Sequence, residues 1–372
     1  MSRPLDIVVL GLSLASSWGN GHATTFRSLL RGVHRLGHRV LFLERQVPWY
    51  DGDHRDLPDP DFCDLAFYGD RGALEQRFAE RVRAADAVIV GSYVPEGVPV
   101  IDWVLATAEG VTGFYDIDTP VTLARLERGD EAYLARRQIP GFDVYFSFTG
   151  GPTLERLQSE FGARSAEALY CSVEAARYAP TGETPVWDLG YLGTYSDDRQ
   201  PTLEALLIEP ARRLPHCRFV VAGPQYPATI DWPGNVDRIE HLPPAEHASF
   251  YSRQRYTLNV TRADMIAAGW SPSVRLFEAA ACGTPIVSDS WKGLEAILPG
   301  GVRTVQGTDE VVALLQQADA AQRSAMAEAA RRVVLADHTG DARAAEFAAA
   351  IHRLLEAGRD REIARTALHP VA

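Results

Sequence analysis

Residues 269–289 read GWSPSVRLFEAAACGTPIVSD and contain a helix with recognisable signals at both ends. Ser271 can cap the first turn, and Pro272 suits the first helical position because its missing N–H would have no partner there. At the other end, Gly283 can take the left-handed conformation that ends a helix, and the proline two residues later prevents continuation. A short apolar strand follows at once over 286–288. The stretch therefore predicts a helix leading directly into a strand of an α/β protein.

Three polar residues of this helix lie on one face. Ser271, Arg275 and Glu278 follow the spacing i, i+4, i+7. The start of such a helix offers free N–H groups and a positive dipole end, which favour an anion. An arginine and a carboxylate one turn further in suit a second phosphate and a ribose diol. The pair also fits an ordinary surface ion pair on a packing helix, and the spacing leaves both interpretations open.

The segment SPSVRLFEAAACGTP, residues 271–285, resembles the donor-site helix of GT-B glycosyltransferases. In that helix, the glutamate before the pattern A-x-A-x-G-x-P holds the nucleotide ribose, a role that the resemblance implies for Glu278. Within the fold, the segment is most similar to the CgeB or spore-maturation type of glycosyltransferase-like protein. Group-1 retaining enzymes also carry a glutamate eight residues earlier that touches the sugar. Trp270 occupies that position here, so sugar recognition and stereochemistry do not follow from that group.

Length and charge narrow the class of protein. A chain of 372 residues exceeds what one core usually covers, so we expect two domains. The net charge of −12 argues against general nucleic-acid binding. We find no apolar run of the roughly 18–20 residues that a membrane helix needs, and the apolar run at 7–10 is too short for a signal peptide.

The four cysteines are scattered, with no C-x-x-C pair: Cys63, Cys171, Cys217 and Cys282. Neither a zinc site nor a disulfide framework is indicated by such spacing. Reduced thiols fit a cytoplasmic protein, which is the location we expect.

The first half of the chain opens with a strand–helix–strand unit. An apolar strand at 7–11 is followed by a loop of small residues, a helix over 22–36 and a second strand at 40–43. This order predicts a right-handed crossover and a parallel sheet. Ligands bind at the carboxyl ends of strands in such sheets. In the resemblance, the glycine loop there faces a cleft between two domains, and the turn after a later strand at 144–148 would also reach it. The expected cleft-loop residues are Gly19, Asn20, Gly21, Thr149 and Gly150.

Two carboxylates follow the strand at 112–116. Asp116 and Asp118 form an Asp-x-Asp triplet, which is the metal motif of a different glycosyltransferase fold. The pattern recurs at 51–53 and 59–61, so it carries little information by itself. GT-B enzymes usually neutralise the diphosphate with helix dipoles and basic side chains, and the resemblance therefore implies no metal. We interpret the two carboxylates as acceptor ligands or a general base, with capping of the next helix as the alternative.

A linker is expected at 178–185, where the pattern lapses into YAPTGETP. A second α/β series begins at residue 188 with a strand, a glycine-containing turn and a helix. In group-1 enzymes, this turn supplies an arginine and, five residues later, a lysine to the diphosphate. Thr194 and Arg199 stand at those positions, so one basic partner is lost, and Arg275 with Arg262 could replace it.

We therefore expect an α/β protein of GT-B architecture, with two facing doubly wound Rossmann-like domains and a deep inter-domain cleft. The N-terminal domain, on the acceptor side, covers 1–180, and the C-terminal domain, on the donor side, covers 186–340. A final helix over 341–372 crosses back to the N-terminal domain. The expected donor-binding residues are Gly193, Thr194, Arg199, Arg262, Ser271, Ser273, Val274, Arg275 and Glu278. The candidate catalytic residues are His22, Asp116 and Asp118.

The expected activity is metal-independent transfer of a sugar from a nucleotide-diphosphate donor to an unknown acceptor, with no cofactor. The acceptor could be a glycan, a protein or a small molecule. A sugar-nucleotide epimerase and a non-catalytic nucleotide-sugar or glycan-binding protein remain as alternatives on the same fold. The resemblance leaves the base, the sugar and the stereochemistry open.

Overall fold

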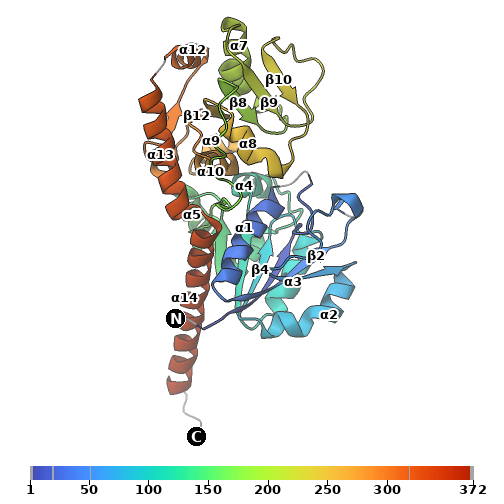
Figure 1. Ribbon diagram of the computed structural model, residues 1–372. Coiled ribbons are helices and arrows are strands. Elements are labelled where there is room, and N and C mark those ends of the chain that lie inside the picture. The colour runs from blue at the N-terminus through green and yellow to red at the C-terminus, as the bar shows by residue number, and fades with distance from the viewer. Residues whose placement is uncertain (1–2, 19–20, 51, 318, 369–372) are drawn as a thin grey trace. The chain divides into compact units, whose positions relative to one another are not determined.

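The computed structural model describes residues 3–18, 21–50, 52–317 and 319–368, with side chains up to residue 358. The chain forms two compact units (Figure 1). Unit 1 comprises Met1–Tyr170 together with Gly340–Ala372, and unit 2 comprises Cys171–Thr339. Each unit contains one parallel sheet with helices, so the predicted α/β class with two Rossmann-like sheets is confirmed.

Unit 1 is built on a seven-stranded sheet of order β3-β2-β1-β4-β5-β6-β7, parallel throughout. Its strands are β1 Asp6–Gly11, β2 Arg39–Arg45, β3 Asp64–Tyr68, β4 Ala87–Gly91, β5 Val111–Asp116, β6 Val144–Ser147 and β7 Ala166–Ala168. Its α-helices are α1 His22–Arg35, α2 Arg71–Ala84, α3 Gly97–Thr107, α4 Thr119–Glu127, α5 Pro152–Ser159 and α14 Gly340–Leu368. The short 3-10 helices are η1 Pro48–Tyr50, η2 Gly52–His54 and η3 Arg136–Gly141.

Alternate residues of the strands point to opposite faces of this sheet. Val8 and Leu10 of β1 belong to one buried apolar cluster, which also contains side chains of α2, α3 and α5. Ile7 and Val9 belong to a second cluster, with side chains of α1 and α14. Both faces of the sheet are therefore covered, as the uninterrupted apolar strands predict.

The helix α14 lies beside α1 (Figure 1). Glycines allow the two helices to approach closely, because a Cβ atom on Gly32 would lie 2.3 Å from the carbonyl oxygen of Gly340. Phe347 and Ile351 of α14 are buried against the sheet, and Arg35 of α1 forms an ion pair with Asp341 (2.7 Å). The end of the chain therefore completes the core of unit 1.

Unit 2 is built on a six-stranded parallel sheet of order β10-β9-β8-β11-β12-β13. Its strands are β8 Leu189–Leu192, β9 Phe219–Ala222, β10 Val236–Ile239, β11 Thr257–Asn259, β12 Ile286–Ser288 and β13 Val302–Thr304. Its α-helices are α6 Gln200–Leu203, α7 Glu209–Arg213, α8 His247–Ser252, α9 Ala263–Ala268, α10 Val274–Ala281, α11 Leu294–Ile297, α12 Thr308–Gln316 and α13 Ala320–Asp337. A π-helical turn, Glu204–Ile208, joins α6 to α7, and η5 Pro244–Glu246 precedes α8.

The quoted helix begins later than we expected from its sequence. The N-cap of α10 is Ser273, whose hydroxyl accepts a hydrogen bond from the Arg275 N–H, and Ser271 lies outside the helix with its hydroxyl donating to the Gly269 carbonyl. The predicted end of the helix is confirmed. Gly283 has a φ of +70°, and the N–H groups of Gly283 and Thr284 bond to carbonyls of the last turn, the geometry of a Schellman motif.

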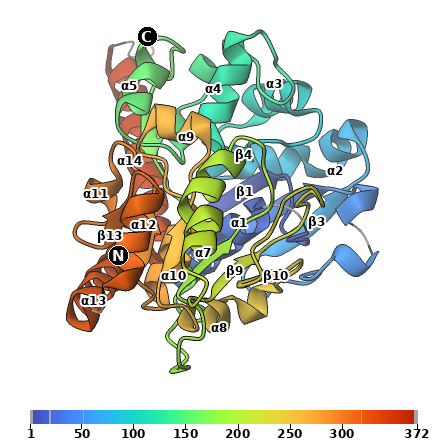
Figure 2. The same ribbon diagram turned by 90° about the horizontal axis from the view of Figure 1, so that it is seen from above.

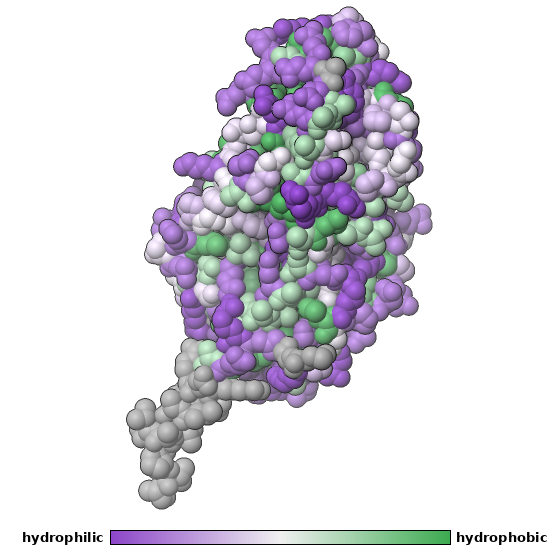
Figure 3. All heavy atoms as spheres, turned by 60° about the vertical axis from the view of Figure 1, so that its left-hand side comes forward, coloured by the Kyte–Doolittle hydropathy of each residue, from purple (hydrophilic) through white to green (hydrophobic). Residues whose placement is uncertain are grey.

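None of the described helices is both long enough and apolar enough to cross a membrane. Hydrophilic residues dominate the face drawn in Figure 3, and the hydrophobic ones form small, separate patches.

Candidate functional site

The turn after β8 is the first part of the candidate site in unit 2. Only glycine fits at position 193, because a Cβ atom on Gly193 would lie 2.6 Å from the Tyr191 hydroxyl and 2.9 Å from Nη2 of Arg275. Arg275 reaches this turn from α10. Its Nε donates to the Leu192 carbonyl, and its guanidinium lies over the Tyr191 ring (4.9 Å). The helix and the glycine turn are therefore joined by one buried arginine.

Two further arginines stand near the same turn. Arg199 donates from Nη2 to the Thr194 carbonyl (2.7 Å), and its buried Nε has no hydrogen-bond partner among the described residues. Burial lowers the pKa of Arg199, and the positive charges of Arg275 and Arg262 lower it further. Arg262 is half exposed, with Nε 3.8 Å from a carboxylate oxygen of Asp198. Three arginines thus stand near this turn, and the unpartnered Nε of the buried Arg199 can donate to an anion.

A buried polar network holds Arg275 from the other side. Nη1 of Arg275 donates to Asn259 at the end of β11 (3.0 Å), and the Asn259 amide donates to the Ser288 hydroxyl at the end of β12 (2.9 Å). Asp289 accepts from the N–H of Thr261 (2.8 Å) and from its hydroxyl (2.7 Å). Burial raises the pKa of Asp289. This network fixes the direction of the Arg275 guanidinium.

Glu278 bonds to partners other than those of Arg275. Its carboxylate is 5% exposed and accepts a hydrogen bond from the Tyr251 hydroxyl (3.1 Å), with Nδ1 of His247 at 3.9 Å. Tyr178, from the segment before β8, bonds to the same imidazole (3.2 Å). Burial and the nearby Glu278 carboxylate raise the pKa of Tyr251 well above its usual value. The interpretation of Arg275 and Glu278 as a surface ion pair is therefore wrong, because both are buried and bonded to different partners.

The segment before α10 is strained. Trp270 has a φ of +49°, which a bulky side chain rarely adopts, and follows Gly269 with a φ of +66°. The Trp270 N–H donates to the Lys292 carbonyl (2.6 Å), and a Cβ atom on Gly293 would lie 2.4 Å from the Trp270 ring. Strain of this kind is held by surrounding contacts and is common at functional sites. Of the expected residues on this segment, Ser273 and Val274 stand at the start of the helix, and Ser271 is buried behind them.

An aromatic pocket in unit 2 was not predicted from the sequence. It follows β9, which lies beside β10 (Figure 2), and has a volume of about 470 Å³. Arg238 lies over the rings of Tyr226 (4.3 Å) and Trp232 (4.6 Å). The Tyr226 hydroxyl donates to the Gly193 carbonyl (3.0 Å), and this bond links the pocket to the arginine turn.

In unit 1, His22 and Asp118 come together at the carboxyl ends of β1 and β5. Nε2 of His22 lies 3.5 Å from a carboxylate oxygen of Asp118. Nδ1 of His22 is buried with no hydrogen-bond partner among the described residues, an arrangement that costs free energy unless a partner is bound. Tyr93, after β4, has a φ of +63° and contacts the imidazole edge to face (5.4 Å). The structure therefore forms a histidine–carboxylate pair beside a strained tyrosine.

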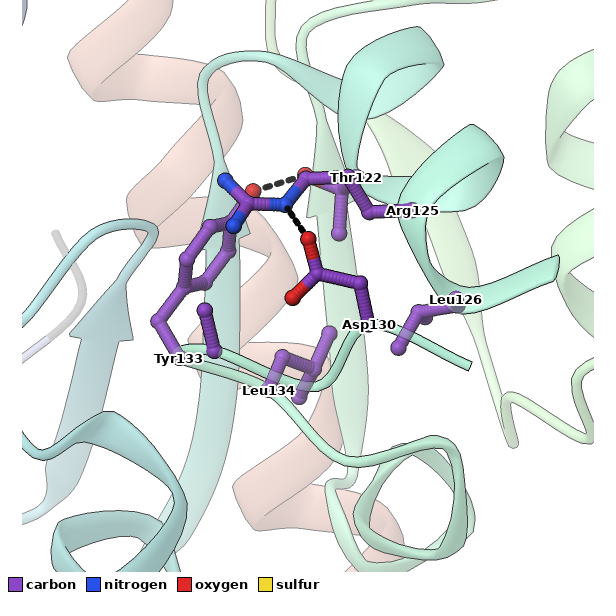
Figure 4. Close-up of a pocket in the computed structure, with 7 residues that line it drawn as sticks. Thr122, Arg125, Leu126, Asp130, Tyr133 and Leu134 are labelled. Carbon is purple, nitrogen blue, oxygen red and sulfur yellow. Dashed lines mark hydrogen bonds and ion pairs between the residues drawn. The ribbon is translucent and has the colours of Figure 1, made fainter. Parts of the chain in front are cut away.

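Asp116 does not share this position, and the interpretation of it as a cleft carboxylate is wrong. Its side chain is fully buried and accepts hydrogen bonds from the hydroxyls of Tyr145 (2.5 Å) and Thr122 (2.8 Å) and from the Asp118 N–H (3.1 Å). Burial raises the pKa of Asp116 to about 6. Figure 4 shows the outer end of this network, where the Thr122 hydroxyl lies 2.7 Å from that of Tyr133. The carboxylate oxygens of Asp116 thus already accept hydrogen bonds from residues of unit 1, and the buried side chain is not available to an acceptor.

The expected cleft loops are described only in part. Gly19 and Asn20 lie outside the described residues, and Gly21 is the N-cap of α1. Thr149 is fully buried, and a Cβ atom on Gly150 would lie 2.0 Å from the Tyr170 hydroxyl. The Thr149 N–H donates to the Ser147 hydroxyl within this turn (3.0 Å), and the assignment of Thr149 and Gly150 to a cleft stays a prediction.

Among the described residues, no group of three or more His, Cys, Asp or Glu side chains is arranged to hold a metal ion.

Comparison with known protein families gives a match over part of unit 2 and the start of α14. Residues 199–349, less than half of the chain, match the family model described as glycosyl transferase-like. This range includes Arg199, Arg262, Arg275 and Glu278. No curated protein matches the chain. Over the matched residues, the protein is glycosyltransferase-like.

Several solved structures have a similar fold over nearly the whole length of this chain. A sucrose-phosphate synthase from Thermosynechococcus elongatus superposes with a TM-score of 0.69 at 14% identity, covering 95% of this chain and 100% of that one. The Anabaena protein HepE, solved with UDP-glucose, gives 0.65 at 12% identity, covering 94% and 100%. An alpha-glucosyltransferase solved with UDP-glucose and DNA containing an abasic site gives 0.68 at 13% identity, covering 94% and 100%. The two parallel Rossmann-like sheets thus match those of GT-B glycosyltransferase structures.

Proposed function

We propose that the protein is a glycosyltransferase that moves a sugar from a nucleoside diphosphate donor to an acceptor nucleophile. The observation that carries the proposal is the convergence of Arg199, Arg262 and Arg275 on the glycine turn after β8. Guanidinium groups suit a diphosphate because they can form paired hydrogen bonds to its oxygens. The match to a glycosyl transferase-like family model over the same residues supports it.

In the proposed reaction, the bond between the anomeric carbon and the diphosphate oxygen breaks, and a bond from that carbon to the acceptor oxygen forms. Negative charge develops on the leaving diphosphate. Arg199 and Arg275, with the N–H groups at Ser273 and Val274, stabilise this charge without reorganising, because packing already holds Arg275 in place. Glu278 accepts hydrogen bonds from the ribose hydroxyls in exchange for its present partners.

The acceptor loses a proton in the same step if the mechanism is inverting. His22 is our candidate to take it, with Asp118 orienting the imidazole and stabilising its charged form. A retaining mechanism needs no such base. The saturated Asp116 is no longer a candidate, and Asp118 alone keeps a carboxylate partly exposed.

Two structural neighbours were solved with UDP-glucose and another with UDP, so a uridine donor is the first to test. Metal independence, a cytoplasmic location, the acceptor-side and donor-side roles of the two domains and the narrower resemblance to the CgeB type remain predictions. Incubation with a panel of nucleotide sugars separates the proposal from its rivals. Hydrolysis or transfer supports a transferase, formation of an epimer supports an epimerase, and binding alone supports a non-catalytic protein.

The donor site is tested by replacing Glu278. Glu278→Ala removes the carboxylate and weakens UDP binding by about 1–3 kcal/mol in calorimetry, as expected for a lost hydrogen bond to a charged group. Glu328→Ala, which removes an exposed carboxylate of α13 in the same unit, is the matched control. Equal UDP affinity in Glu278→Ala and the parent would remove Glu278 from the site.

A further inference from the structure

Unit 1 exposes two tryptophans in the segments that follow two neighbouring strands, β1 and β2. Trp18 is 54% exposed and Trp49 is 59% exposed, and they are the largest apolar side chains left open among the described residues. Trp18 belongs to the loop after β1, which leads to His22, and Trp49 belongs to the loop after β2. The carboxyl ends of neighbouring parallel strands are where open α/β sheets bind ligands.

The two loops are bonded to each other. The Trp18 ring stacks on the imidazole of His54, with 4.3 Å between centroids and 11° between planes, and Nδ1 of His54 lies 3.2 Å from the Trp49 carbonyl. The Ser16 hydroxyl donates to the His54 carbonyl (2.6 Å). We call Trp18, Trp49 and His54 the aromatic platform.

Two carboxylates hold the segments that carry the platform, an exposed one at Asp56 and a buried one at Glu44. Asp56 accepts two hydrogen bonds from Arg27 of α1 (2.7 and 2.9 Å) and one from the Ser17 N–H (2.8 Å). These donors outweigh the effect of burial and lower the pKa of Asp56 to about 2. Glu44, 1% exposed, accepts from the N–H groups of Leu14 (2.6 Å) and Ala15 (2.9 Å). The described residues around Trp18 and His54 are therefore held by hydrogen bonds within unit 1, and preorganisation of this kind lowers the cost of binding.

We propose that the aromatic platform binds a carbohydrate acceptor, stacking an indole on the C–H face of a sugar ring. This inference rests on the proposed function for its acceptor role. A rigid indole offers a large apolar face, and an imidazole and the nearby carboxylate of Asp53 can pair with hydroxyls at the ring edge. Exposed tryptophans also occur at membrane surfaces, but this loop is acidic, with Asp53, Asp56, Asp59 and Asp61, in a chain of net charge −12. An anionic lipid surface would be repelled, whereas a neutral sugar would not.

The experiment measures retention of the full-length protein on an array of neutral oligosaccharides, beside binding to vesicles of phosphatidylcholine and phosphatidylglycerol. Trp18→Ala and Trp49→Ala are compared with Leu36→Ala, which removes an exposed apolar side chain (47% exposed) from the same unit away from the platform. UDP calorimetry on every variant reports the donor site independently. We expect the parent to bind at least one oligosaccharide, each tryptophan variant to bind it ~10-fold or more weakly, and Leu36→Ala to bind as the parent does.

The outcomes separate the two proposals. UDP binding together with no oligosaccharide binding, or with equal binding by the tryptophan variants, overturns the platform and leaves the donor site standing. Vesicle binding that is lost in the tryptophan variants overturns the carbohydrate assignment in favour of a membrane surface. Tryptophan-dependent oligosaccharide binding in a protein that does not bind UDP keeps the carbohydrate site and removes the proposed transfer.

Discussion

The carboxyl edges of the two sheets have the same order of elements but carry side chains of different charge and polarity. Each has a strand, a short loop with glycine and a helix at the centre of the sheet, β1–α1 in unit 1 and β8–α6 in unit 2. Arginines gather at the edge in unit 2, where burial and then the neighbouring positive charges lower the pKa of Arg199. Unit 1 gathers an imidazole, a carboxylate and exposed indoles instead. The shared topology thus decides where a ligand lies, and the side chains at the strand ends decide which kind of ligand it is.

The largest effect is expected from removing the buried arginine of unit 2. This change tests whether the carboxyl edge of that sheet binds an anion. Arg275→Ala should weaken UDP binding by about 2–5 kcal/mol, because it removes a held positive charge and leaves Asn259 and the Leu192 carbonyl without their donor. Arg213→Ala, which removes the same charge from a surface pair with Asp309, should leave UDP affinity nearly unchanged in the same calorimetry. Thermal unfolding of both variants separates a lost contact from a lost fold. Parent-like UDP affinity in folded Arg275→Ala would show that the edge in unit 2 is not the anion site.

The next effect concerns rate rather than affinity. His22→Ala should lower kcat by about 10²–10⁴-fold if the imidazole accepts the acceptor's proton, and Asp118→Asn should lower it less, because it only disturbs the orientation of the ring. Donor binding, measured by UDP titration, should stay close to the parent in both. A large loss of donor affinity in either variant would mean that the edge in unit 1 also holds the phosphates.

A smaller effect is expected from Asp116, and it appears in stability. The pKa of Asp116 in the folded protein is about 6, against about 4 in an unfolded chain, so the folded state holds this proton more tightly. The contribution is therefore fully present below about pH 4 and is lost as the pH rises through about 6, by roughly 3 kcal/mol at most. Asp116→Asn, in which the amide can donate to Tyr145, should remove that fall from the pH profile of urea unfolding. Asp59→Asn, an exposed carboxylate of the same unit, should keep it.

The smallest effect is expected from metal removal. EDTA-treated protein should bind UDP as before and keep most of its activity, since the arginines supply the positive charge that a metal would otherwise bring. A strict requirement for Mn²⁺ or Mg²⁺ that Asp118→Asn abolishes would contradict this and restore the Asp-x-Asp triplet as a metal motif.

The sequence predicts the parts of the molecule that local patterns determine. The apolar run at 7–11, the glycine-rich loop and the following helix define the first parallel unit, and Gly283 ends α10 as expected. The start of α10 was misplaced because Ser271 and Ser273 both suit a cap, and the positive φ of Trp270 delays the helix by two residues. Local patterns also cannot reveal that Asp116 is buried, because its partners Thr122 and Tyr145 come from other elements. The strand β3 follows a segment rich in Asp and Pro, and its pairing with β2 is a tertiary contact that the local pattern does not show.

The last helix also sets an order of events during synthesis. Unit 2 is continuous in the chain, so it can fold once residues 171–339 have emerged from the ribosome, whereas the sheet of unit 1 lacks its cover of α14 until the residues after 339 have emerged as well. During that interval, the apolar surface that Phe347 and Ile351 later bury stays open to water and to other chains. A chain truncated just before Gly340 would keep all of unit 2 and would leave the sheet of unit 1 without the side chains of α14 that cover it.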